Sequence, residues 1–300
     1  MTTVDETIER IVPVRHWGRW IAGGISLAAL GFLVYFFAAN EQIRWSVVGQ
    51  YLTGRTILQG VLVTLELTVL AMIIGVLLGV VLAVMRKSEN GVLRWISGLY
   101  IWFFRGTPIL VQIVFWFNIA LFVPTIGFGS FEISTNTLIS GFTAALLALS
   151  LNEAAYMAEI IRAGITSIDR GQGEAASALG YTPLQTMRYI VLPQALRVIV
   201  PPTGNETINM LKMTSLVSVV AAQDLLTRAQ EISARNYLVI ELLIVASIWY
   251  ILMTTVLSVG QYFVEKRLSR GYARSVRPLT AQQVLRDLLP IRGKRGAENV

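Results

Sequence analysis

The sequence predicts an all-α integral membrane protein. Its 300 residues are 54% hydrophobic and only 14% charged, which is too apolar for an ordinary soluble domain. Several windows with few or no charges reach the length of about 20 apolar residues that a bilayer core requires. Short polar segments separate these windows. We therefore expect membrane-spanning helices joined by polar turns and loops.

Six windows are long and apolar enough to be counted as spans. In chain order they cover residues 20–39, 57–85, 95–123, 138–161, 190–222 and 238–264. The first follows Arg10, Arg15 and Arg19, as a signal peptide would, but it is too long for one and no small-residue cleavage site follows. We expect an extra N-terminal helix within residues 1–54, a core of five transmembrane helices over 55–265, and a basic tail over 266–300.

The positive charges predict an orientation for these spans. With the N-terminus inside, segments 1–19, 86–107, 162–197 and 265–300 face the cytoplasm and hold 20 of the 25 Lys and Arg residues. The positive-inside rule therefore predicts that both termini are cytoplasmic. The basic tail is most simply a contact with anionic lipid, with nucleic-acid binding the minor alternative. The chain has no cysteine, which excludes disulfides and thiolate metal sites.

Two polar segments are expected to join neighbouring spans. Residues 87–91 end in Asn90-Gly91, a pair that tolerates positive φ and favours a tight turn. Residues 123–136 are rich in Gly, Ser and Thr and predict an external loop. Within the second window, Gly75 and Gly79 form a G-x-x-x-G pair that permits close helix approach.

Residues 167–183 predict a short polar elbow. Small residues form a thin helix there, and Gly180 suits the left-handed conformation that ends a helix. Thr182 can cap the next helix, with Pro183 at its first position and Gln185 three residues after the cap. A helix, a glycine stop and a new helix would make an elbow that a soluble protein could bind.

This elbow carries a family resemblance. Glu174-Ala175-Ala176, Gly180, Ile190 and Leu192-Pro193 have the spacing E-A-A-x3-G-x9-I-x-L-P, which resembles the loop of ABC-importer permeases that docks on the ATP-hydrolysing subunit. Further stretches resemble the polar amino-acid uptake branch in the family's order over residues 55–265, namely 104–108, 153–162, 171–172, 192–195 and 212–216.

The resemblance implies a type I ABC-importer permease in a bacterial inner membrane that moves polar amino acids. It implies as partners two ABC ATPase subunits, a second permease subunit (identical or homologous) and an extracytoplasmic substrate-binding protein. The chain lacks a G-x-x-x-x-G-K-[ST] phosphate loop, so we expect that it does not hydrolyse ATP and is not an enzyme. We expect no cofactor in this chain, because ATP and Mg would be bound by the partner ATPase. The implied coupling-loop residues are Asp169, Gly171, Gln172, Glu174, Ala175, Ala176 and Gly180.

Polar residues within the spans are candidates for the translocation pathway, because ionisable groups inside a membrane usually face a cavity or a route. These candidates are Glu153, Asn205, Glu206, Asn209 and Lys212. A role in bonding helices together is an equal alternative for Glu153. Glu206 and Met213 depart from the residues common in the family, which leaves the substrate's charge open. Gly106, Pro108, Pro193, Pro201 and Pro202 are candidate points where helices break or bend during transport, and simple tolerated kinks are an equal alternative.

Two other functions remain open from the residues alone. An ion-driven secondary transporter would use Glu153 or Glu241 as its ion site, but it would need no elbow for an ATPase. A membrane anchor or assembly protein would carry no solute, and the polar residues within the spans count against it.

Overall fold

The computed structural model describes residues 17–127 and 132–268. The chain divides into two units, Met1–Gln42 with Tyr272–Val300, and Ile43–Gly271. The first unit contributes helix α1 (Trp17–Ala38), whose described side chains are all exposed. The expected basic tail beyond Leu268 and the arginines before residue 17 lie outside the described residues.

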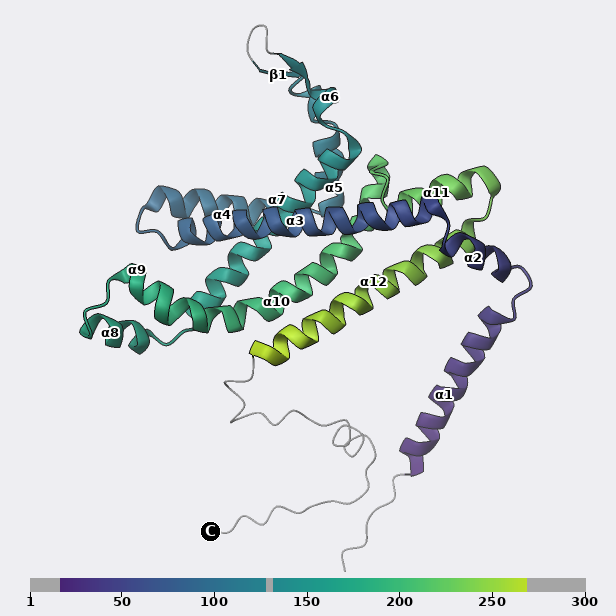
Figure 1. Ribbon diagram of the computed structural model, residues 1–300, viewed down its shortest axis with the longest axis horizontal. Coiled ribbons are helices and arrows are strands. Elements are labelled where there is room, and N and C mark those ends of the chain that lie inside the picture. Colours follow the sequence, from purple (N-terminus) through teal and green to yellow (C-terminus); the bar gives the residue numbers. More distant parts are fainter. Residues whose placement is uncertain (1–16, 128–131, 269–300) are drawn as a thin grey trace, which may run out of the picture. The chain divides into compact units, whose positions relative to one another are not determined.

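The second unit is a set of packed helices with one short hairpin (Figure 1). Its elements are α2 (Trp45–Leu52), α3 (Arg55–Lys87), α4 (Gly91–Gly106), α5 (Ile109–Phe117), η1 (Ile119–Leu121), β1 (Thr125–Ile126), β2 (Ile133–Ser134), α6 (Thr135–Leu138), α7 (Gly141–Thr166), α8 (Arg170–Ala178), α9 (Pro183–Thr186), the π-helical turn η3 (Met187–Val191), α10 (Leu192–Met213), η4 (Thr214–Val220), α11 (Leu225–Asn236) and α12 (Val239–Leu268).

Helices α3 and α7 form the most extensive helix pair of this unit. Two glycines on α3 permit their close approach. A Cβ on Gly75 would stand 2.7 Å from Cγ of Glu153, and one on Gly79 would stand 2.6 Å from Cβ of Met157. Real Cβ atoms do not tolerate such distances, so only glycine fits at both positions. The close approach predicted from the G-x-x-x-G spacing is confirmed.

The described helices differ from the six expected membrane spans in one respect, which is the character of the fifth. Four described helices are long and apolar enough to cross a membrane, namely α1, α3, α7 and α12, and α4 with α5 makes a fifth if the bent pair is one span. The remaining predicted span, residues 190–222, contains α10. This helix has 22 residues but carries polar side chains along its length, so it is not among the helices apolar enough to be counted as a span. Burial of part of α10 against α7, α12 and α3 explains how it tolerates that composition.

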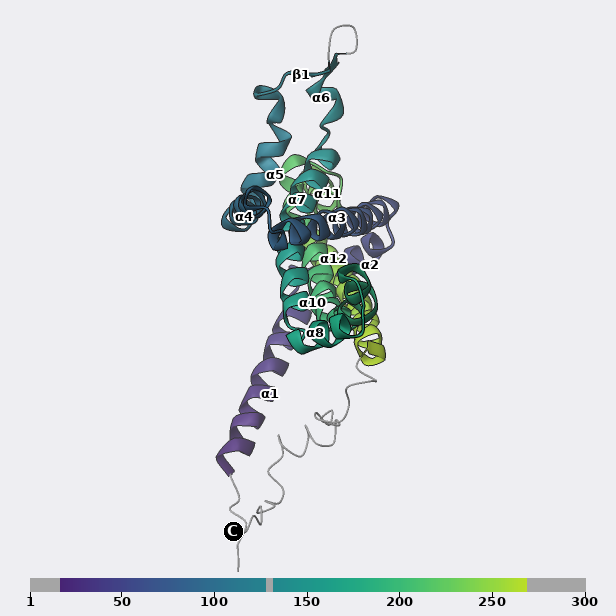
Figure 2. The same cartoon turned by 90° about the vertical axis from the view of Figure 1, so that its left-hand side faces the viewer.

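The polar segments between spans also show how local chemistry shapes the chain. The turn at 87–91 forms, but not by positive φ as expected. Asn90 instead has φ −69° and caps α4, with its side chain accepting a hydrogen bond from the Val92 amide. The loop at 123–136 contains the antiparallel β1–β2 hairpin, which stands away from the packed helices in both views (Figure 1, Figure 2).

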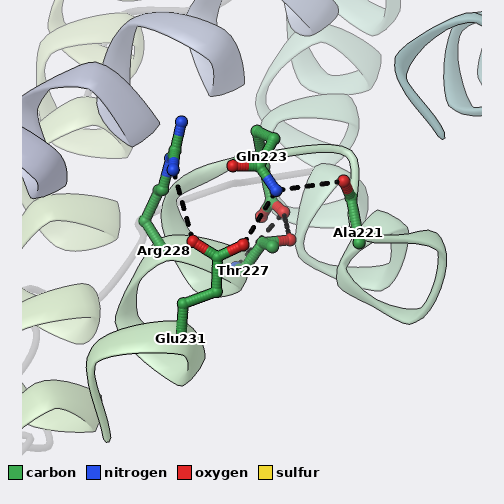
Figure 3. Close-up of polar contacts among 6 residues, drawn as sticks. Ala221, Gln223, Thr227, Arg228 and Glu231 are labelled. Carbon is green, nitrogen blue, oxygen red and sulfur yellow. Dashed lines mark hydrogen bonds and ion pairs between the residues drawn. The ribbon is translucent and has the colours of Figure 1, made fainter. Parts of the chain in front are cut away.

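The corner between η4 and α11 is built from unusual backbone. Ala221 and Gln223 have φ of 50° and 65°, a region that residues other than glycine rarely adopt. The Gln223 amide donates to Glu231 at 2.8 Å and to the Ala221 carbonyl at 3.4 Å, and Arg228 pairs with Glu231 at 3.2 Å (Figure 3). These contacts hold the strained corner in place. Within the second unit, α8 and α9 lie at the end opposite to α2 and α11 (Figure 1).

Candidate functional site

The elbow predicted at 167–183 forms from α8, a glycine turn and α9. Asp169 caps α8 by accepting a hydrogen bond from the Gly171 amide at 2.6 Å. Gly180 ends the helix with φ +81°, as its position predicted. Most residues with a side chain would be strained at that φ, asparagine least among them, although the space around the Cβ position is open.

The next helix begins with the predicted capping box. The Gln185 amide donates to the Thr182 hydroxyl at 3.3 Å, and the Thr182 amide donates to the Gln185 side chain at 2.8 Å. Pro183 occupies the first helical position. The predicted order of helix, glycine stop and capped new helix is thus confirmed.

The elbow presents an exposed surface. The side chains of Glu174 and Ala175 are exposed, whereas Ala176 packs inward with 1% of its surface accessible. Leu179 and Leu184 are each 77% exposed, which is unusual for leucine on a surface that meets only water. Leu179, Gly180, Tyr181, Gln185 and Tyr189 surround a hollow of ≈ 410 Å³. The elbow therefore combines exposed leucines with a fixed backbone shape.

Helix α7 leads directly into this elbow. Only residues 167–169 separate its end at Thr166 from the start of α8. Near that end Glu159 and Arg162, three residues apart on the helix, form an ion pair with 2.7 Å between Oε2 and Nη2. A helix of 26 residues is about 39 Å long, so α7 connects the elbow with residues deep in the unit.

Glu153 lies on α7 in a buried position beside Gly75. It is 3% exposed, and its Oε1 atom has no hydrogen-bond partner within residues 17–127 and 132–268. The hydroxyl of Ser150, one helical turn earlier and 2% exposed, also lacks a partner among those residues. Two buried polar groups without partners on one helix face would each cost about 1–3 kcal/mol. They form a polar spot in an otherwise apolar environment.

The polar residues of α10 do not share one environment. Asn205 contacts α12, where its side-chain oxygen accepts a hydrogen bond from Gln261 at 3.1 Å. Glu206 and Asn209 are half-buried three residues apart on the helix, and Lys212 is exposed. The polar residues of α10 therefore divide into Asn205, which bonds to α12, and Glu206, Asn209 and Lys212, which follow it along the helix.

The expected helix breaks are found at some positions and not at others. Residues 106–108 lie between α4 and α5, whose axes differ by 102°. The π-helical turn η3 comes immediately before Pro193. In contrast, α10 continues through Pro201 and Pro202 without an interruption, which differs from the expectation. A proline removes one donor and crowds one carbonyl, and a packed helix absorbs this without ending.

Two buried amides were missed at the sequence level. Gln112 on α5 and Asn152 on α7 are 5% and 6% exposed, and each donates a hydrogen bond to the Phe104 carbonyl. A signal was available, because Gln112 is the one polar residue of α5 and Asn152 sits in a long apolar window. A side-chain amide in such a setting needs a hydrogen-bond partner, and a carbonyl left without an amide donor by the nearby Pro108 is the partner that the sequence offers.

Comparison with known proteins places the chain in a family. Residues 75–270 match the family described as "Binding-protein-dependent transport system inner membrane component". The chain belongs to this family of importer permeases. Its members are the membrane-spanning subunits of ABC importers, in which separate ATPase chains hydrolyse ATP. The expectation that this permease is not itself an enzyme is confirmed on that ground.

Curated relatives cover most of the permease. It is 45% identical over 274 residues to the arginine transport system permease protein ArgU of Corynebacterium glutamicum, which covers 91% of this chain and 86% of the relative. It is 38% identical to the L-cystine transport system permease protein TcyB of Bacillus subtilis, covering 77% of this chain and 94% of that protein. The probable glutamine ABC transporter permease protein GlnM of the same organism is 37% identical, with 70% and 91% covered.

Solved structures identify the fold. A chain of the crystal structure of an amino acid ABC transporter with histidines is 38% identical and has a TM-score of 0.63, covering 71% of this permease and 94% of that chain. A chain of the MetNI methionine ABC transporter is 20% identical with a TM-score of 0.58, covering 77% and 100%, and supports the fold alone. The permease therefore has the type I ABC-importer fold expected from its sequence.

Proposed function

We propose that this permease imports polar amino acids that an external substrate-binding protein delivers, with ATP hydrolysis on partner chains driving the transport cycle. The observation that carries the proposal is the elbow of α8 and α9. It has a backbone shape fixed by Gly180 and by two helix caps, and it exposes Leu179 and Leu184. Such a surface suits a groove on a soluble partner.

The orientation and assembly follow from the same proposal. The charge bias favours a cytoplasmic location for both termini and the elbow, where two ATPase subunits would bind two copies of the elbow. The second permease subunit is a further copy of this chain or a homologue. The strained corner of η4 and α11 lies at the opposite end of the unit and would face the binding protein (Figure 1). The coupling-loop residues are then Asp169, Gly171, Gln172, Glu174, Ala175, Ala176 and Gly180.

The amino-acid class rests on the relatives. The curated relatives carry names that specify arginine, cystine and glutamine, and their sequences align with most of this chain. The substrate we would test first is therefore arginine, followed by glutamine and cystine. A carrier driven by an ion gradient is the competing function, and it would leave the elbow without a partner.

Reconstitution tests this function directly. The permease, its co-purified ATPase and its binding protein are placed in vesicles, and uptake of labelled arginine, glutamine and cystine is measured. We expect uptake that requires ATP and the binding protein and that persists when ion gradients are collapsed. Uptake that follows an imposed proton or sodium gradient without ATP would instead establish the ion-driven carrier.

For the pathway we propose that Glu153 meets the ammonium group of an amino acid in transit, with Asn205, Glu206, Asn209 and Lys212 further along the route. The support is the buried and unpartnered Oε1 atom of Glu153 beside the unpartnered hydroxyl of Ser150. A carboxylate that lacks a partner in a buried position is stabilised by a cationic group arriving from outside.

A glutamine substitution tests this role of Glu153. Glu153→Gln keeps the shape of the side chain and removes its charge, so we expect uptake to fall about tenfold or more while the subunit remains assembled with its ATPase. Glu66→Gln is the matched control, because Glu66 is exposed on α3 and lies outside the proposed route. Unchanged uptake by the Glu153→Gln variant would remove Glu153 from the pathway and leave it a role in helix packing.

A further inference from the structure

The corner between α4 and α5 carries an unusual set of hydrogen bonds. In a continuous helix the Phe104 carbonyl would accept from the amide of residue 108. Residue 108 is proline, which has no amide hydrogen, and the two helix axes differ by 102° at this point. The Phe104 carbonyl therefore needs other donors, because a buried carbonyl without one is costly in an apolar environment.

Two side-chain amides supply these donors. Gln112 Nε2 donates to the Phe104 carbonyl at 3.0 Å and to the Thr107 hydroxyl at 2.7 Å. Asn152 Nδ2, on α7, donates to the same Phe104 carbonyl at 2.8 Å and lies 3.3 Å from Oε1 of Gln112. Both amides are almost completely buried. The corner is thus closed from α5 and tied to α7 by one carbonyl that both side chains share.

A second bond ties α4 to the same turn of α7. The Tyr100 hydroxyl donates to the Leu151 carbonyl at 2.8 Å, next to Asn152 in the chain. If the corner moved relative to α7, these hydrogen bonds would break and leave buried amides and a carbonyl unbonded. This is costly where no water can replace the lost bonds. The corner and this part of α7 are therefore expected to move as one body.

We propose that Asn152 and Gln112 are positioning residues that transmit movement of the elbow to the α4–α5 corner. We use the term clamp for the side chains of Gln112 and Asn152 together with the Phe104 carbonyl that both of them bond. Helix α7 carries Asn152 in its middle and ends just before the elbow, so a pull on α8 reaches the corner through α7. This inference rests on the proposed function, because it needs an ATPase that moves the elbow.

A coupling measurement tests the clamp. The reconstituted transporter is assayed for ATP hydrolysis and for uptake in the same vesicles, comparing wild type with Asn152→Leu. We expect hydrolysis to continue while the number of amino acids imported per ATP falls about fivefold or more, which is the usual size of a coupling between sites. Asn152→Gln keeps an amide donor and is expected to retain part of the wild-type ratio. An unchanged ratio in Asn152→Leu would overturn the proposal.

The control and the second variant guard against a purely structural effect. Asn118→Leu removes the side-chain amide that ends α5 and that, in the described part of the chain, donates only to the Val114 carbonyl, so its ratio is expected to match wild type. If Asn152→Leu does not assemble, Gln112→Met removes the other donor at similar length and is expected to show the same loss. Wild-type vesicles that import nothing with ATP would reject the proposed function itself, whereas active wild type with unchanged Asn152→Leu and Gln112→Met ratios rejects only the clamp.

The geometry of the corner provides a measurement that does not depend on activity. The chain has no cysteine, so Ile96→Cys on α4 and Phe117→Cys on α5 give a unique pair of exposed sites for spin labels. In a transporter assembled with the label pair on one permease subunit alone, we expect one narrow distance distribution that broadens when Asn152→Leu is added. A distribution that stays narrow in the Asn152→Leu variant would show that the corner needs no clamp.

Discussion

Replacing Gly180 by valine is expected to abolish import while leaving the permease in the membrane. The glycine has φ +81°, and nothing lies within 4 Å of its Cβ position, so the penalty is conformational and not steric. An L-residue in the left-handed region costs about 1–2 kcal/mol, and a β-branched one costs more. The elbow would leave its native shape, and the ATPase would lose the surface that it binds.

An asparagine substitution separates conformation from bulk in this experiment. Gly180→Asn adds a side chain of comparable size, but asparagine tolerates the left-handed conformation. We expect Gly180→Asn to retain ATPase co-purification and most of the uptake, and Gly180→Val to lose both. Equal loss in the two variants would mean that the docked partner excludes any side chain at this position, and normal uptake in both would refute the coupling role of the elbow.

The second large effect is expected at Gly79. A valine there would force its Cβ into the space held by Cβ of Met157 and close to the backbone amide of Ala158, 3.1 Å from the Cβ position. Backbone cannot move aside as the end of a flexible side chain can, so α3 and α7 would have to separate. Overpacking of this kind typically costs about 1–3 kcal/mol, and here it falls on the most extensive helix pair.

Thermal unfolding in detergent measures this effect. We expect Gly79→Val to lower the midpoint of unfolding or to prevent purification of the folded subunit. Gly260→Val on α12 is the matched control, because nothing lies within 4 Å of its Cβ position. Equal unfolding midpoints for Gly79→Val and wild type would show that α3 and α7 are less closely packed than described.

Much of the elbow could be predicted because its signals are local. Gly180, Thr182 and Gln185 determine backbone and caps within a few residues of themselves, so their sequence spacing is sufficient. The clamp at Phe104 was not predicted because Gln112 and Asn152 meet only after α5 and α7 pack together. That α10 does not end at Pro201 and Pro202 could not be predicted for a related reason, since packing around α10 decides whether a proline ends the helix.

The same distinction applies to Glu153. Its position within an apolar window could be read from the sequence, and the sequence also showed the glycine pair on α3. That Gly75 lies directly against this glutamate depends on the register between two helices, and no local pattern determines that register. The unpartnered hydroxyl of Ser150 was not predicted, because a serine in a helix usually donates a hydrogen bond to the backbone of its own helix.

The pairing of α3 with α7 has a consequence for how the protein is made. Gly75 meets Glu153, and the whole of α4 and α5 is synthesised between them. At about 5–20 residues per second, the ribosome needs roughly 4–16 s to extend the chain from one residue to the other. During that interval α3 has no α7 against which to bury its glycine face. Biogenesis of this subunit therefore includes an interval in which lipid or another helix covers this face of α3 until α7 emerges.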